Sequence, residues 1–135
     1  MLRPLVADGR GYDAKPTTEQ ELVAALQDMD TQFRAEGDPR LVVIFAYPEV
    51  PDTPRLSIGL GANESVVTYD ESIETGEGAI SLGPRVDDHS DVGFSYGTGY
   101  SGFLASHLVP KDDAIAAARE FFRTGRRPTN LDWEE

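Results

Sequence analysis

The chain has 135 residues, of which 24 are acidic and 12 are basic, so its formal net charge is -12 at pH 7. This length predicts one domain over residues 1–135 with a buried core. The chain has no cysteine, which excludes disulfide bonds, thiolate metal sites and a thiol nucleophile. The excess of acids argues against direct binding of nucleic acid or of anionic membranes, and it favours a basic partner.

Targeting and membrane segments are not predicted. Residues 1–11 contain only short apolar pieces, which cannot form the core of a signal peptide. No stretch approaches the roughly 20 apolar residues that span a bilayer. We therefore expect a cytoplasmic protein.

The first predicted element is a helix near residues 19–35. Thr18-Glu19-Gln20-Glu21 has the pattern of a capping box, in which Thr18 and Glu21 each accept a hydrogen bond from a free backbone amide. Apolar residues then recur at spacings of four, three and four, and form one stripe: Leu22, Leu26, Met29 and Phe33. Gly37 and Pro39 end the helix.

Several short strands are predicted to follow. A β-branched and aromatic run at residues 41–47 indicates a buried strand that ends at Pro48, and a turn follows. The next segments predict a hairpin and then a continuing meander: 55–60 with 65–69, then 79–82, 92–96 and 102–106. Inward-facing residues of the hairpin should include Leu56, Ile58, Val66 and Tyr69. No connection after Pro48 is long enough for a crossover helix, so antiparallel pairing is favoured.

The last predicted element is a helix that begins at Pro110 and ends at Gly125. Asp112 and Asp113 suit the positive end of its dipole, and a glycine is the usual residue after a helix C-terminus. Its apolar stripe should be Ile115, Ala118 and Phe122, flanked by Ala114 and Phe121. Trp133 is expected to hold the tail on the core.

The order helix, strands, helix predicts an α+β fold. We expect a mostly antiparallel β-meander sheet packed with an N-terminal and a C-terminal helix, one or both of which cover a face of the sheet.

Motifs for catalysis and for metal binding are weak. Gly97-Thr98-Gly99-Tyr100-Ser101-Gly102 matches the spacing of a dinucleotide-binding loop, but it lies between two predicted strands and opens no helix. A hairpin or bulge is the favoured interpretation. The two histidines, His89 and His107, lie in no metal-binding pattern. We predict no catalytic residue, no metal site and no cofactor.

Negative charge is concentrated between Asp70 and Asp91, a segment that contains seven acidic residues and one basic residue, Arg85. Two interpretations remain open. The segment is either a solvated loop or a docking surface that attracts a basic partner and adds aromatic contact area. The candidate partner-binding residues are Asp70, Glu71, Glu74, Glu77, Asp87, Asp88, Asp91, Tyr96 and Tyr100.

The C-terminal region resembles the immunity protein 1 family of bacterial polymorphic toxin systems. The resemblance rests on a Val-Pro helix start at Val109, an alanine-rich helix that ends in Phe121-Phe122, a Thr-Gly-Arg-Arg-Pro stop and Trp133. It covers the last 27 residues closely, and the rest of the chain agrees in plan. The matched residues have the character of structural anchors: Pro110, Phe121, Phe122, Gly125, Pro128 and Trp133.

The resemblance implies a small, non-catalytic α+β protein that binds and inhibits a secreted toxin, often a nucleic-acid deaminase. Such a toxin needs a basic groove leading to its zinc-bound water, and an acidic protein can occupy that groove. The zinc ion would belong to the toxin. Two alternatives remain open: a small acidic adaptor or regulatory subunit of another basic protein, and an acyl- or phosphate-handling enzyme that uses the loop at residues 97–102.

Overall fold

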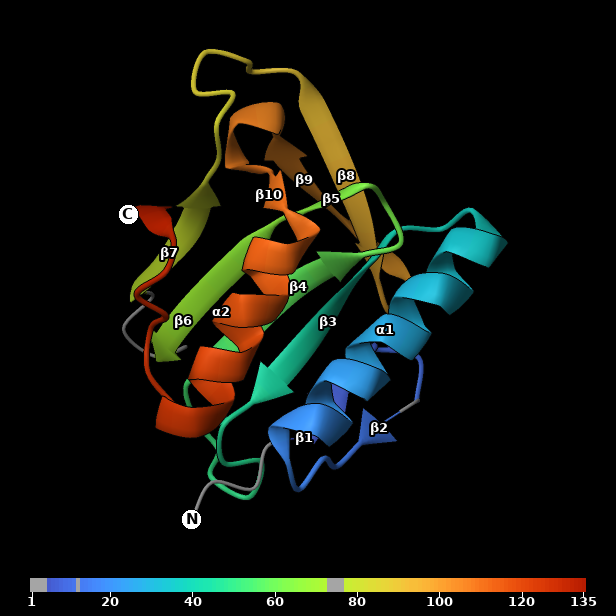
Figure 1. The fold of residues 1–135 in the computed structure, drawn as a ribbon, viewed down its shortest axis with the longest axis vertical. Coiled ribbons are helices and arrows are strands. Elements are labelled where there is room, and N and C mark those ends of the chain that lie inside the picture. Colours follow the sequence, from blue (N-terminus) through green and yellow to red (C-terminus); the bar gives the residue numbers. More distant parts are fainter. Residues whose placement is uncertain (1–4, 12, 73–76) are drawn as a thin grey trace.

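The structure is a computed structural model, which describes residues 5–11, 13–72 and 77–135 (Figure 1). Its helices are α1 (Glu19–Glu36), α2 (Lys111–Thr124) and the short 3-10 helix η1 (Ala105–His107). Its strands are β1 (Leu5–Ala7), β2 (Asp13–Ala14), β3 (Arg40–Phe45), β4 (Arg55–Leu60), β5 (Glu64–Ser65), β6 (Val67–Ser72), β7 (Glu77–Leu82), β8 (Asp91–Tyr96), β9 (Gly99–Leu104), β10 (Val109–Pro110) and β11 (Asp132–Glu134).

The strands form one large sheet and a small two-stranded one, which confirms the predicted α+β fold. The large sheet has the order β11-β7-β6-β4-β3-β1-β2, and its neighbours along this path are antiparallel. The antiparallel hairpin of β8 and β9 joins it through a single parallel bridge between Arg40 and Ser95. That bridge was not predicted, because the chain passes from β3 to β8 through four other strands, β4 to β7, and no crossover helix is needed.

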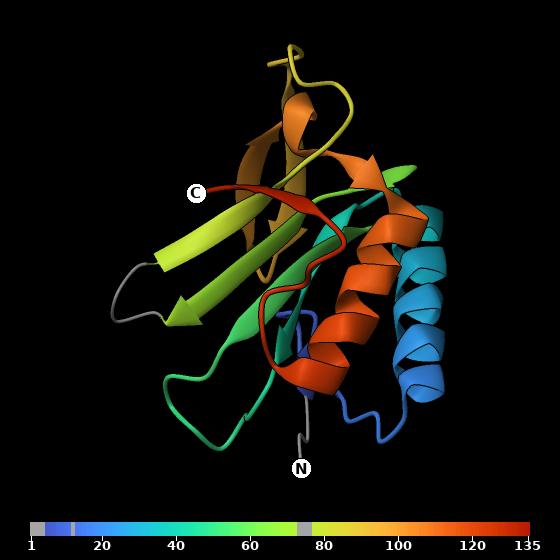
Figure 2. The same cartoon turned by 60° about the vertical axis from the view of Figure 1, so that its left-hand side comes forward.

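Both helices pack on the same face of the sheet and lie side by side, with the β8–β9 hairpin on the opposite side (Figure 2). The predicted stripe of α1 is buried in the main core: Leu22, Leu26, Met29 and Phe33. The strands that face the helices contribute Val42, Ile44, Leu56 and Ile58 to the same core. Thr18 caps α1 by accepting from the Glu21 amide at 3.1 Å, and Gly37 ends it with a φ of 65°. The Glu21 carboxylate accepts from the Thr17 hydroxyl at 2.8 Å, one residue before the partner that a capping box predicts.

The apolar stripe of α2 lies one residue away from its predicted centre. Its buried residues are Ala114, Ala117, Ala118 and Phe121, whereas Ile115 and Phe122 are only partly buried. The small alanines allow close approach to α1 and the sheet, so they take the central line. The Phe121 ring meets Tyr69 of β6 edge-on, with 6.1 Å between the ring centroids.

The second face of the sheet carries a smaller cluster, consisting of Leu41, Val66, Phe94, Ala105 and Leu108. Val66 is buried as predicted, but it faces this second cluster and not the main core, where Leu56 and Ile58 lie. It lies between β5 and β6, where the Gly59 amide donates to the Val66 carbonyl at 2.9 Å. This interruption shifts the alternation of side chains by one residue, so that Val67 faces the main core.

The glycine-rich segment forms the turn and second strand of the β8–β9 hairpin, which confirms the hairpin interpretation. Gly97 has a φ of 57° in the turn. The strand begins at Gly99, earlier than the predicted Gly102, and it ends at Leu104, where the chain enters η1.

The two ends of the described chain add short strands that were not predicted. β1 pairs with β3, and β11 pairs with β7 at the opposite side of the sheet. Trp133 of β11 packs against the main core and donates its indole N–H to the Pro128 carbonyl at 2.9 Å, so it holds the tail as expected. Within the described residues, no helix is long and apolar enough to cross a bilayer.

Candidate partner-binding site

The predicted partner-binding residues fall into three places. Asp70 and Glu71 lie near the end of β6. Asp87 and Asp88 lie in the connection between β7 and β8, and Asp91 begins β8. Tyr96 and Tyr100 flank the turn at the other end of the β8–β9 hairpin. Glu77 begins β7, and Glu74 lies outside the described residues.

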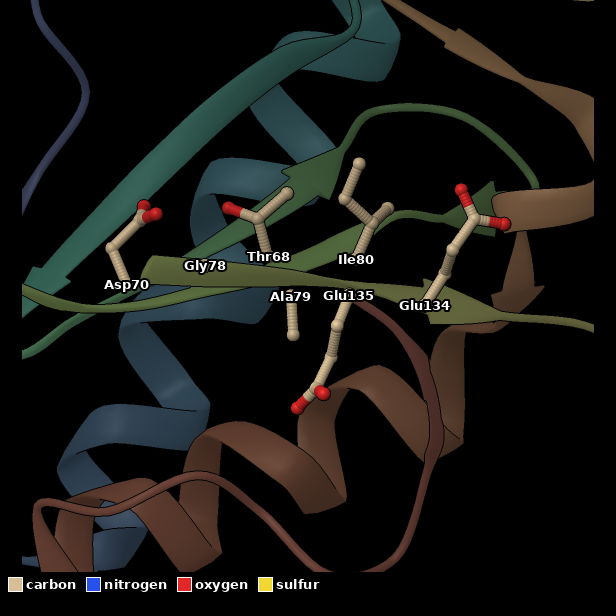
Figure 3. Close-up of a pocket in the computed structure, with 7 residues that line it drawn as sticks. All are labelled: Thr68, Asp70, Gly78, Ala79, Ile80, Glu134 and Glu135. Carbon is tan, nitrogen blue, oxygen red and sulfur yellow. The ribbon is translucent and has the colours of Figure 1, made fainter. Parts of the chain in front are cut away.

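A shallow hollow of about 380 Å³ opens where β6, β7 and β11 meet (Figure 3). Its lining residues are Thr68, Asp70, Gly78, Ala79, Ile80, Glu134 and Glu135. The side chains of Asp70, Thr68, Ile80 and Glu134 project to the same side, whereas Ala79 and Glu135 point the other way (Figure 3). An apolar side chain thus lies between two carboxylates, which suits the aliphatic stem and charged end of a lysine or arginine.

Asp70 is a partly desolvated carboxylate. Burial raises its pKa, and the positive charge of Arg55, its cross-strand neighbour on β4, offsets only part of that effect. Its carboxylate lies against Gly78, where a Cβ atom would come within 2.5 Å of Asp70 Oδ1. The Arg55 guanidinium lies over the Phe45 ring, 5.4 Å from the centroid, and its buried Nε has no hydrogen-bond acceptor among the described residues. Asp70 and Arg55 thus form a partly buried pair of opposite charges beside the hollow.

The acids of the β7–β8 connection have different roles. Asp88 Oδ1 accepts from the Ser90 hydroxyl at 2.6 Å and from the Ser90 amide at 3.0 Å, and these hydrogen bonds lower the Asp88 pKa. The Asp88 carbonyl accepts from the Ser106 amide at 2.8 Å, which ties the connection to η1. Asp87 and Asp91 are exposed. We conclude that Asp88 stabilises the turn, whereas Asp87 and Asp91 present charge to solvent.

The two tyrosines also differ. Tyr100 is 74% exposed, and its ring covers Gly93, where any Cβ atom would collide with it. Tyr96 is partly buried, and its ring lies beside Gly9 of the N-terminal segment. Tyr100 is thus the available contact residue, and Tyr96 helps to hold the hairpin in place.

The two histidines lie in unrelated surroundings. His89 is exposed in the β7–β8 connection, whereas His107 is 5% exposed in η1. His107 Nδ1 accepts from the Leu104 amide at 3.2 Å, and its Nε2 lies 3.4 Å from Glu134 Oε1. In the part of the chain that the structure describes, no three acidic or histidine side chains are grouped to hold a metal ion.

The structure does not bring the predicted residues together at one point. Asp91 and Tyr96 end the same strand and are therefore about 17 Å apart. Sequence reasoning missed three residues here: Arg55, which is the cross-strand neighbour of Asp70, and Glu134 and Glu135, which line the hollow. Hairpin alternation could have placed Arg55 opposite Asp70, but Glu134 reaches Ile80 only through the pairing of β11 with β7, which has no local signal.

Comparison with known proteins identifies the family. No curated protein matches the chain significantly. The family described as immunity protein Imm1 matches over residues 10–135, which includes both helices and the sheet strands from β2 onwards. The match extends far beyond the C-terminal region that carries the sequence resemblance, and it implies a cognate toxin as the partner. The chain therefore belongs to the immunity protein Imm1 family.

Proposed function

We propose that this protein neutralises a nucleic-acid deaminase toxin in the cytoplasm, by binding it and covering its active site, without catalysing a reaction itself. The observation that carries the proposal is the family match over residues 10–135, which supports a toxin as the partner. The net charge of -12 supports a basic partner.

The chemistry of deamination supports the choice of toxin class. An enzyme that acts on DNA or RNA must attract a polyanion and lead one base to its zinc-bound water. An acidic protein can compete for the same basic groove, because it offers carboxylates where the substrate offers phosphates. The zinc ion belongs to the toxin in this proposal.

We place the interface on the surface formed by the acids of residues 70–91 and the tyrosines of the β8–β9 hairpin. Asp87, Asp91 and Tyr100 are the best candidates for direct contact, because all three are exposed. Asp88 and Tyr96 would support the contact surface from within. An interface of ordinary size would bury about 800 Å² on each partner.

The first experiment is co-expression of the toxin domain encoded next to this chain, with and without the chain. We expect cells to survive only when both are present, and size-exclusion chromatography to recover a 1:1 complex. The purified chain should also abolish deamination of single- and double-stranded nucleic acid when it is added in equal amount. Cell death despite good expression, with no complex, would contradict the proposal. A complex that still deaminates would remove active-site coverage but leave toxin binding.

Point variants test the proposed interface. Tyr100→Ala should weaken toxin binding by about tenfold or more, since exposed aromatic anchors contribute most to such interfaces. Asp87→Asn and Asp91→Asn should mainly slow association, by about two- to tenfold. Asp28→Asn is the matched control, because Asp28 is an exposed acid on α1, and α1 lies on the face of the sheet opposite the hairpin (Figure 2). Unchanged affinity in all three test variants would exclude this surface.

A further inference from the structure

β9 has a long edge without charged residues. It pairs only with β8 among the described strands, and none of its six residues, Gly99–Leu104, is charged. The large sheet ends elsewhere in β2, which has two residues and includes Asp13, and in β11, which has three residues and includes Asp132 and Glu134. Short and charged edges resist pairing with other chains, whereas an uncharged edge of ordinary strand length invites it.

Three hydrogen bonds establish which backbone groups of β9 point away from β8. The Ala105 amide donates to the Ser90 carbonyl at 2.8 Å, so the backbone N–H and C=O groups of the odd-numbered residues of β9 point toward β8. The Leu104 amide donates to His107 Nδ1 at 3.2 Å, away from β8. The Ser95 amide donates to the Pro39 carbonyl, on the side of β3. Tyr100 lies opposite Ser95 in the hairpin, so the backbone groups of Tyr100 do not bond to β8. Because the direction alternates along a strand, the N–H and C=O groups of Tyr100 and Gly102 point outward.

This outward edge is accessible. Gly99, Tyr100 and Gly102 are all exposed. A Cβ atom at Gly102 would have nothing within 4 Å, so open space adjoins this residue. No backbone hydrogen bond engages the outward groups of Tyr100 and Gly102 within the described residues.

We propose that the toxin adds an extended strand to β9, with main-chain hydrogen bonds to Tyr100 and Gly102. This inference rests on the proposed function, since it takes the toxin as the partner. Strand addition draws affinity from the main chain and specificity from the side chains on either side of it. Here the exposed ring of Tyr100, which lies over Gly93 of β8, offers an aromatic contact on the face of the hairpin beside this edge.

The charge near this edge predicts that the toxin strand is basic. Leu104, at the other end of the edge, pairs with Asp91, and Asp87 lies in the connection just before β8. An added strand would therefore place a lysine or arginine beside these two exposed acids. A strand of about six residues spans about 20 Å, which is enough to reach both the acids and Tyr100. The edge thus joins two groups of predicted contact residues that are too far apart to form one point of contact.

The decisive variant is Gly102→Pro, with Gly102→Ala as its matched control. Proline removes the outward N–H and places its ring on the free edge, while it leaves the hydrogen bonds between β8 and β9 intact. Alanine keeps the N–H, and its methyl group enters open space. We expect Gly102→Pro to weaken toxin binding by at least about tenfold and Gly102→Ala to change it by less than about twofold. Equal binding by the proline variant, with its fold verified by circular dichroism, would overturn strand addition.

Amide exchange in the unaltered protein gives a second test that does not depend on a variant's folding. The ¹⁵N-labelled chain would be compared by NMR alone and bound to unlabelled toxin domain. We expect the amides of Tyr100 and Gly102 to exchange rapidly in the free chain and to be protected by at least about tenfold in the complex. If a complex forms and these two amides stay unprotected, strand addition is wrong while toxin binding stands. If no complex forms, the proposed function itself fails.

Discussion

Asp30 illustrates how one side chain can join three separate parts of the structure. It lies on α1, and its Oδ1 accepts from the Gly61 amide at 2.7 Å and from Lys111 of α2. Lys111 also donates to the Ala62 carbonyl. Burial raises the Asp30 pKa, but the hydrogen bonds from Lys111 and Gly61, together with nearby positive charge, outweigh burial and leave the pKa below its ordinary value of 3.8.

Replacing Asp30 by asparagine should therefore destabilise the protein in a pH-dependent way. At pH 7 we expect Asp30→Asn to lower the free energy of unfolding by about 1 to 3 kcal/mol, because Lys111 loses a charged acceptor while it is largely buried. A carboxyl with a lowered folded-state pKa stabilises the fold above its unfolded pKa, and this contribution disappears as the pH falls through the folded pKa.

Urea unfolding at a series of pH values measures this effect. The difference between the wild type and Asp30→Asn should shrink as the pH is lowered from about 5 to about 2. Asp28→Asn serves as the control, since Asp28 is exposed on the same helix. A difference that stays constant over this range would show that the charge of Asp30 is not the cause.

At the scale of elements, the β8–β9 hairpin depends on a few contacts with the sheet. Phe94 of β8 is 1% exposed, and its ring lies directly over Gly59 of β4. Arg40 of β3 donates to the Gly97 carbonyl at 2.7 Å and to Asp38 at 2.8 Å. The hydrogen bonds that Asp38 accepts from Arg40 and from the Ser95 hydroxyl lower the Asp38 pKa.

Gly59→Ala should weaken the attachment of this hairpin. The added Cβ atom would lie 2.6 Å from Phe94 Cε1, so either the ring or β4 must move. We expect a loss of about 1 to 3 kcal/mol in the free energy of unfolding, as for other overpacked sites. Chemical denaturation measures it, and Gly102→Ala, another strand glycine but with open space around it, should change stability little. Equal stability of the two variants would argue that Phe94 does not depend on the space at Gly59.

At the scale of the whole molecule, the helices and the proposed interface lie on different sides. α1 and α2 cover one face of the sheet, and the hairpin with its free edge lies on the other (Figure 2). The net charge of -12 acts over the whole surface and would steer a basic toxin from a distance, whereas the edge of β9 would decide how the toxin is held.

This division predicts a specific dependence on salt. Raising sodium chloride from about 0.05 M to about 0.5 M should lower the association rate constant with the toxin by at least about tenfold, because the Debye length falls. The dissociation rate constant should change much less, since short-range contacts control it. Stopped-flow or surface plasmon resonance measurements separate the two rates. An association rate that does not respond to salt would exclude electrostatic steering.

The sequence by itself determined the features that depend on neighbouring residues. Thr18 and Gly37 mark the two ends of α1, and Gly125 ends α2, because helix ends are stabilised by hydrogen bonds within a few residues. The α+β class followed from the order of the periodic segments. The family resemblance was also local, in the run from Val109 to Trp133.

Only the tertiary structure decided which residues meet across the fold. Val66 faces the second cluster because the hairpin alternation shifts beside Gly59, and Glu134 lies beside Ile80 because β11 pairs with β7. The edge of β9 is open because β8, with which β9 pairs, lies between β9 and β3, and no other described strand pairs with β9. Pairing between distant strands depends on the packing of the whole chain, and no short sequence pattern encodes it.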